Sequence, residues 1–269
     1  MTESRSVQRE LESVLKRYKE ILHWRVTSRT TEEWQQLWWS EQESVLLDQS
    51  REARESEVRL WISVRLGDPL SDDTTPPEYQ GESEVTLRLE LPLQAQIESL
   101  IATARATRLK YWKPFPSGTS VGPTPTVDQM AASPEILENP EQALSSLEAG
   151  LMAAVRQNLE HPQRPSGQRE PSSVQFHSAE TALIRETRSR VWSEGAESLD
   201  FSTSAYAEVA VSSTSRGGAQ SSRSDEYLHI VHGVSVKDLK LNMLISEAME
   251  RAQEMILVEP TRGGTLPVI

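Results

Sequence analysis

The stretch EYLHIVHGVSVKDLKLNMLISEAMERAQEMIL, residues 226–257, joins an alternating apolar and polar run to a long amphipathic run. The first part has the period of two that is typical of a half-buried strand, and Gly233 marks its end. Ser235 and Asp238 are spaced as a capping pair, so a helix is expected to begin there and to reach about residue 257. We expect this helix to pack on the strand through Leu241, Leu244, Ile245, Ala248, Ala252 and Met255.

Residues 138–162 carry a second strong helix signal. Asn139 can cap the helix, Pro140 suits its first position, and Gln142 can reach back to close a capping box. Its apolar face is expected to hold Leu144, Leu147, Leu151 and Val155.

The same periodicities predict the other elements. Helices are expected over 4–22 and 93–108, the latter buried through Ile97, Leu100, Ile101 and Ala104. Strands are expected within 24–68, 83–92 and 174–234.

Helices and strands are therefore grouped along the chain, which favours an α+β fold over a doubly wound parallel one. We expect an antiparallel β-meander and a β-ribbon, both packed with amphipathic helices. The polar, proline-containing residues 163–173 suggest a boundary between an N-terminal α+β region, 1–162, and a second region, 174–269. The second region would hold the β-ribbon, the long helix and the start of a C-terminal strand, packed as one unit with the first.

Composition excludes several classes of function. The formal net charge of −12 disfavours a dedicated nucleic-acid binder and binding to anionic membrane surfaces. No apolar run approaches the roughly 20 residues that span a bilayer. The absence of cysteine removes thiol nucleophiles and cysteine-ligated metals, and fits a cytoplasmic protein.

No catalytic set is visible among the motifs. His229 and His232 could bind a metal, but on a strand residues three apart point to opposite faces, so a packed and an exposed histidine are the favoured interpretation. The glycine pairs at 217–218 and 263–264 match neither a phosphate-binding loop nor a dinucleotide fingerprint. We therefore assign no catalytic residue, no metal ligand and no cofactor.

Two aromatic stretches admit a core or a contact role. Trp34 and Trp38 lie four residues apart, and Trp39 would face the other side of a strand. A core role is favoured for them over a docking surface, where exposed tryptophan is common. The basic and aromatic residues 108–116 could stack on bases or peptide side chains, although the acidic whole disfavours nucleic acid.

One stretch resembles a known family. In RETRSRVWSEGAESLDFSTSAYAEVAV, residues 185–211, a strand carries Trp192, Ser193, Glu194 and Gly195 and precedes an alternating strand. This resembles the middle region of the TldD/PmbA family, also described as modulators of DNA gyrase and as microcin-processing metallopeptidases. Trp192 stands where that family usually has Asn. The ending VEPTRGGTLPVI resembles the family's turn and strand, with Pro260, Gly264, Pro267 and Val268 at the motif positions.

The resemblance covers the N-terminal and middle regions of that family. In TldD-type members the strand at Pro267 and Val268 leads into a C-terminal domain whose HExxxH helix binds zinc and cleaves peptides. PmbA-type members lack that motif and act as partners of a catalytic subunit. This sequence has no His-Glu pair, so no zinc ligand or general base is carried over, and any active site would lie outside these residues.

Three functions follow as hypotheses. The first is the non-catalytic substrate-binding and dimerisation portion of a TldD/PmbA-type peptidase system, in which edge strands of 174–234 add a peptide strand; its substrate-binding residues are unknown. The alternative is a stand-alone adaptor or assembly protein that pairs with a separate catalytic subunit. The third is a metalloenzyme using His229 and His232. The expected partners are a homo- or hetero-oligomeric subunit of this family and a peptide, with no nucleic acid and no membrane.

Overall fold

The computed structural model of the chain describes residues 10–41, 44–67, 77–112, 132–160, 172–216 and 222–257. These residues form two compact units, each assembled from three segments of the chain. Unit 1 comprises 1–31, 54–128 and 186–201, and unit 2 comprises 32–53, 129–185 and 202–269. The expected boundary at 163–173 lies almost wholly outside the described residues.

A seven-stranded sheet with the order β4-β3-β2-β1-β5-β6-β7 supplies strands to both units. Its pairs β2–β3, β3–β4 and β6–β7 are antiparallel, as predicted. Four strands, β1, β2, β5 and β6, are 20 to 22 residues long and pass from one unit to the other. The strands are β1 (Ile21–Glu41), β2 (Ser44–Arg65), β3 (Tyr79–Leu87), β4 (Leu109–Lys110), β5 (Ser172–Trp192), β6 (Glu197–Arg216) and β7 (Ser222–Gly233).

The helices are α2 (Leu93–Arg105), α3 (Pro134–Glu138), α4 (Pro140–Glu160), the 3-10 helix η1 (Val236–Leu239) and α5 (Leu241–Leu257). Residues 10–15 are also helical. The α+β class is thereby confirmed. No helix within the described ranges is both long and apolar enough to cross a membrane.

The core of unit 1 lies between the sheet and the helices at 93–105 and 10–15. On β2, the even-numbered residues from Val58 to Val64 are buried, as their alternation predicts. All four residues predicted for the inner face of α2 are buried against them: Ile97, Leu100, Ile101 and Ala104.

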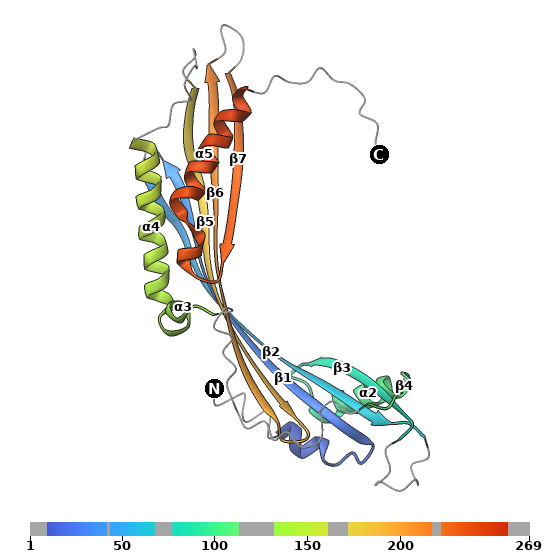
Figure 1. Cartoon of the computed structure of the whole chain (residues 1–269). Helices are drawn as coiled ribbons and strands as arrows, with labels where there is room; N and C mark the ends of the chain where they lie inside the picture. Colours follow the sequence, from blue (N-terminus) through green and yellow to red (C-terminus); the bar gives the residue numbers. More distant parts are fainter. Residues whose placement is uncertain are drawn as a thin grey trace, which may run out of the picture. The chain divides into compact units, whose positions relative to one another are not determined.

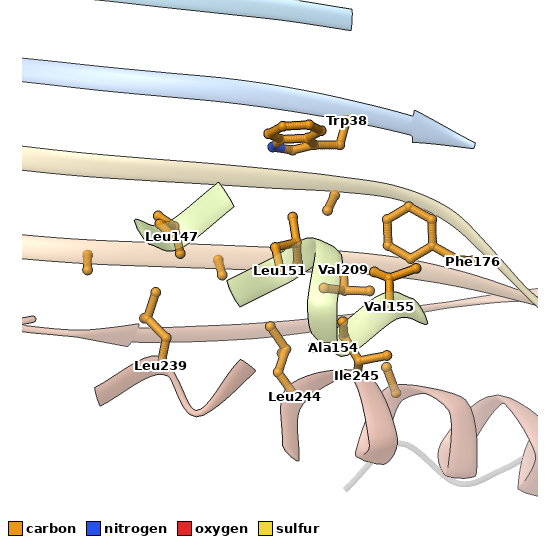
Figure 2. Close-up of a cluster of buried hydrophobic side chains, with 14 of the residues drawn as sticks. Trp38, Leu147, Leu151, Ala154, Val155, Phe176, Val209, Leu239, Leu244 and Ile245 are labelled. Carbon is orange, nitrogen blue, oxygen red and sulfur yellow. The ribbon is translucent and has the colours of Figure 1, made fainter. Parts of the chain in front are cut away.

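The core of unit 2 lies under α4 and α5, which cover one face of β5, β6 and β7 (Figure 1). From α4, Leu147 and Leu151 are fully buried, and Val155 is nearly so. Figure 2 shows these side chains between Trp38 of β1 and the α5 residues Leu244 and Ile245. The predicted faces of both long helices are buried, except that Leu144 and Leu241 are only partly buried and the side chain of Met255 lies outside the described residues.

The predicted caps form with two differences. The side chain of Asn139 accepts a hydrogen bond from the Gln142 amide, but the Gln142 side chain accepts from the Asn139 side chain instead of its backbone. Ser235 and Asp238 make the expected capping box. It caps η1, because Lys240 has a φ of +44° and interrupts the helix before α5 begins.

Three element boundaries differ from expectation. The opening helix does not continue to residue 22, since β1 begins at Ile21. Strand β3 begins at Tyr79 and ends at Leu87, earlier than the expected 83–92. The short helix α3 was not predicted; Ser133 and Pro134 begin it, and Ile136 anchors it in the core.

Candidate binding surfaces

The family-like residues of β5 and β6 form a tight hairpin in unit 1. Trp192 and Ala196 are joined across it by a backbone hydrogen bond of 3.0 Å, and Gly195 donates to the carbonyl of Trp192 at 2.9 Å. Gly195 has a φ of +81°, a conformation that costs glycine little and other residues more. Ser193 exchanges hydrogen bonds with the backbone of Trp24 on β1.

Glu194 of this hairpin reaches the imidazole of His23, a residue of β1 that is 9% exposed. Its Oε1 lies 2.5 Å from His23 Nδ1, and the other ring nitrogen, Nε2, lies 3.4 Å from the Tyr111 hydroxyl. A carboxylate on one imidazole nitrogen fixes the orientation of the ring. The order carboxylate, imidazole, hydroxyl is that of a catalytic triad. Here, however, the hydroxyl belongs to a tyrosine, so the three groups do not match a serine nucleophile activated by a histidine base. The contacts tie the hairpin to β1 and to the residue that follows β4.

Around this cluster the second face of the unit 1 sheet carries paired charges. Arg29 contacts Glu186 at 2.5 Å, Arg25 contacts Glu84 at 3.1 Å, and Arg190 contacts Asp200. The Arg25–Glu84 pair is exposed, and such a pair contributes about 1 kcal/mol or less, whereas the other two pairs are partly buried. In all three contacts a positive group is matched by a negative one, so these residues do not concentrate charge of one sign.

The aromatic residues of 108–112 contact their own unit. Arg108 lies 4.0 Å from the ring centroid of Tyr79, and Trp112 packs 6.0 Å from Trp61, centroid to centroid. The indole nitrogen of Trp112 also donates to Glu82 at 2.5 Å. Residues 113–116 of this stretch lie outside the described residues.

The tryptophans at 34, 38 and 39 differ in burial. Trp34 and Trp38 are buried in the core of unit 2, as the favoured interpretation predicts. Trp39 is 47% exposed and lies on the opposite side of β1, with its ring 4.4 Å from that of His177.

His229 and His232 lie on β7, on opposite faces as the strand reading requires, because exposure alternates residue by residue from 226 to 232. His229 Nε2 lies 3.2 Å from Glu247 of α5, and the His232 side chain is exposed. In the described residues no group of three or more metal-ligating side chains converges.

Among the described strands, β7 is an edge of the sheet, and it exposes an apolar pair. Leu228 is 55% and Ile230 53% exposed, because Tyr227 and Val231 turn the other face toward the core. They stand opposite Ala210 and Glu208 of β6, respectively. We call Leu228 and Ile230 the β7 patch.

Two of the β6 residues on this face, Tyr206 and Glu208, are polar and contact each other. The Tyr206 hydroxyl donates to Glu208 at 2.5 Å. Burial, followed by this hydrogen bond and the charge of Glu208, raises the pKa of Tyr206 well above its ordinary value. The hydroxyl therefore remains a neutral donor at physiological pH. One carboxylate oxygen of Glu208 accepts its hydrogen bond.

The remaining family-motif positions, Pro260, Gly264, Pro267 and Val268, lie outside the described residues. Of the eight motif positions, the structure therefore describes the four that build the β5–β6 hairpin. The sequence analysis placed these residues on a strand that precedes another strand but did not predict the tight turn. The partners His23 and Tyr111 carry no local signal, because they are distant in sequence.

Solved structures share this fold. A crystal structure from Thermotoga maritima MSB8, described as a candidate modulator of a DNA gyrase, matches with a TM-score of 0.57 and 10% identity over 97% of this chain and 50% of that chain. A structure from Bacteroides thetaiotaomicron with the same description matches with a TM-score of 0.50 and 15% identity, over 94% and 50%. TldE from Thermococcus kodakarensis matches at 0.48 and 13% identity, over 92% and 47%.

No protein-family model and no curated protein sequence matches the chain. The assignment rests on the two structures with the higher scores, whose identities are low enough to establish the fold alone. The chain spans about half the length of each. It therefore has the fold of one half of the DNA gyrase modulator structures, and the resemblance to the TldD/PmbA family seen in residues 185–211 is confirmed at the level of the fold.

Proposed function

We propose that this chain is the non-catalytic substrate-binding and dimerisation portion of a TldD/PmbA-type peptidase system that acts on peptides. The observation that supports this most is the match of nearly the whole chain to only half of each related structure. A segment with the fold of one half is suited to hold and orient a peptide, while the cleavage chemistry would belong to residues elsewhere.

The β7 patch supports the dimerisation part of the proposal. An edge strand presents unpaired main-chain groups, and two adjacent aliphatic side chains more than half exposed add apolar area that a partner can bury. The partner is a subunit of the same family, either a second copy of this chain or one that carries HExxxH. We place the zinc of the system on residues that carry HExxxH, outside this sequence.

The test is assembly measured by light scattering after size-exclusion chromatography. The purified chain is run alone and with an HExxxH-containing subunit of the family from the same source. We expect a stable oligomer in at least one case, and zinc-dependent peptide cleavage only when the HExxxH subunit is present. Leu228→Glu combined with Ile230→Glu should abolish assembly, because two charges would be buried at the contact.

Met243→Glu is the matched control, because Met243 of α5 is 54% exposed and lies in the same unit. It should assemble as the unchanged chain does. Assembly without any effect on cleavage would favour the stand-alone adaptor. A folded monomer that binds neither a second copy nor the zinc subunit would overturn the proposal.

A further inference from the structure

The outer edge of β3 in unit 1 is only partly covered. Strand β4 pairs with β3 at Tyr79 and Gln80 and extends no further. From Glu82 to Leu87 the other side of β3 pairs with β2, so its ladder is complete on that side. In the part of the chain that the structure describes, no strand lies against the outer side of this run.

The hydrogen bonds at both ends show which residues direct their backbone groups outward. Glu78 accepts from Tyr111 on the β4 side, and Glu82 both donates to and accepts from Thr107. Arg88 bonds to Gln96 in the same reciprocal way. These residues are all even-numbered, and successive residues of a strand alternate in direction. The N–H and C=O groups of Glu84 and Thr86 therefore point outward too.

Thr107 and Gln96 act as substitutes for a neighbouring strand. The Thr107 hydroxyl accepts a hydrogen bond from the Glu82 N–H at 2.7 Å. It can donate its own proton to the carbonyl oxygen of Glu82 or of Ala104, which lie 3.1 Å and 2.8 Å from the hydroxyl oxygen. Gln96 binds both backbone groups of Arg88 at 2.9 Å. Between these two side chains, the outward groups of Glu84 and Thr86 have no partner among the described residues.

A groove lies beside this gap. It has a volume of about 450 Å³ and runs between β3 and α2. Val85 and Leu91 give it an apolar wall. Its helix side is formed by Ala95, Ser99 and Thr103, which recur every four residues and are exposed. The helix wall is therefore built from small side chains that leave room for another chain.

We propose that the edge of β3 at Glu84 and Thr86, which we call the β3 groove, binds an extended peptide segment as an added strand. Two outward pairs of N–H and C=O groups, two residues apart, match the repeat of a peptide in β conformation. Alternate peptide side chains would enter the groove beside Val85 and Leu91, where aliphatic groups fit. The others would lie on the face of Glu84, where an acidic side chain is disfavoured.

This inference shares with the proposed function only the class of ligand, a peptide, and it assigns a site in a different unit from the β7 patch. The probe is a short fluorescein-labelled peptide in which threonine and valine alternate. Its control has the same side chains but is N-methylated at every residue, so that it cannot donate main-chain hydrogen bonds. Binding is measured by fluorescence anisotropy with the full chain.

Thr86→Pro is the decisive variant. It removes the backbone N–H of residue 86, which points outward. The hydrogen bonds from β3 to β2 are made by odd-numbered residues and should therefore remain. Proline is tolerated on an edge strand when its missing N–H would face away from the neighbouring strand. Thr86→Ala changes the same side chain but keeps the N–H, which makes it the matched control. Ala95→Trp fills the groove from the exposed face of α2 and serves if the proline variant does not fold.

We expect the unmethylated peptide to bind the unchanged chain and Thr86→Ala alike. Thr86→Pro and Ala95→Trp should weaken binding about tenfold or more, since one loses a main-chain contact and the other the space. Equal binding of the methylated peptide, undiminished binding by folded Thr86→Pro or Ala95→Trp, or no binding at all would overturn the inference. Assembly through the β7 patch should survive both variants, so failure of either proposal can be told from failure of the other.

Discussion

At Gly81 of β3 the end of α2 approaches the strand closely, and replacing this glycine with alanine should destabilise unit 1. A Cβ atom built there would lie 2.0 Å from the carbonyl oxygen of Ala104, 2.7 Å from its carbonyl carbon and 3.3 Å from the nitrogen of Arg105. All three neighbours are backbone atoms, so no side-chain rotation relieves the contact. Reaching even 3.0 Å from that oxygen requires α2 to move by about 1 Å from β3.

The cost follows from what this shift disturbs. Ala104 is fully buried, and Ile101 is 3% exposed, so moving the helix end opens a packed contact. Thr107, which links Glu82 to the end of α2, would lose hydrogen-bond geometry as well. Overpacking of this kind costs about 1–3 kcal/mol, and the absence of a movable side chain points to the upper end, about 3 kcal/mol.

Gly150→Ala is the matched control with the opposite sign. The added Cβ at this position of α4 would lie 2.9 Å from Leu241 Cδ1, the end of a side chain that can rotate. Alanine also favours a helix over glycine by up to about 1 kcal/mol. The same substitution should therefore leave unit 2 unchanged or stabilise it by up to ~1 kcal/mol.

The assay is urea unfolding followed by circular dichroism, with amide hydrogen exchange to separate the two units. Gly81→Ala should lower protection in α2 and β3, whereas Gly150→Ala should preserve or raise it in α4. A Gly81→Ala chain with unchanged protection in α2 and a free energy of unfolding within about 0.5 kcal/mol of the original would refute the close approach.

Three further outcomes are expected. Leu151→Ala should lower the free energy of unfolding of unit 2 by about 3 kcal/mol in the same assay, because the residue is fully buried between α4 and the sheet. Glu194→Ala should cost about 1–3 kcal/mol by leaving the His23 ring nitrogen without its carboxylate, and exchange at the β5–β6 hairpin would report it. The Asp238 carboxylate accepts from the Ser235 amide and hydroxyl, which lowers its pKa; its capping contribution should be complete above the ordinary aspartate pKa and be lost as the pH falls through the lowered value. Titration by NMR gives that pKa, and Asp238→Asn should remove this pH dependence of η1.

The elements with a strong period were predictable from sequence. The spacing of apolar residues was enough to predict the inner faces of α2 and α4. The caps at Asn139 and Ser235 could be predicted because each is followed three residues later by a polar side chain that can bond to it. Local chemistry decides these features, so one sequence is enough.

The long strands were only partly predictable, because much of their length has no alternation. Residues 48–57 of β2 are almost entirely polar or charged and mostly exposed, yet they are strand. Their pairing partners, not their own hydrophobicity, hold them extended, which is the context dependence that limits strand prediction. Four long strands contribute residues to both units. The polar composition of 163–173, which suggested a boundary, gave no indication of this division.

The family-like residues show why a motif can indicate a fold without indicating a reaction. Gly195 supplies a positive φ, Ser193 binds the backbone of β1, and Glu194 holds the His23 ring. Each role closes the hairpin and secures it to its neighbouring strand. Any chain that must end β5 and begin β6 beside β1 needs these three functions, whether or not its own unit cleaves peptides. The hairpin residues are thus accounted for by the fold, and the proposals for binding rest on the edges of β7 and β3 instead.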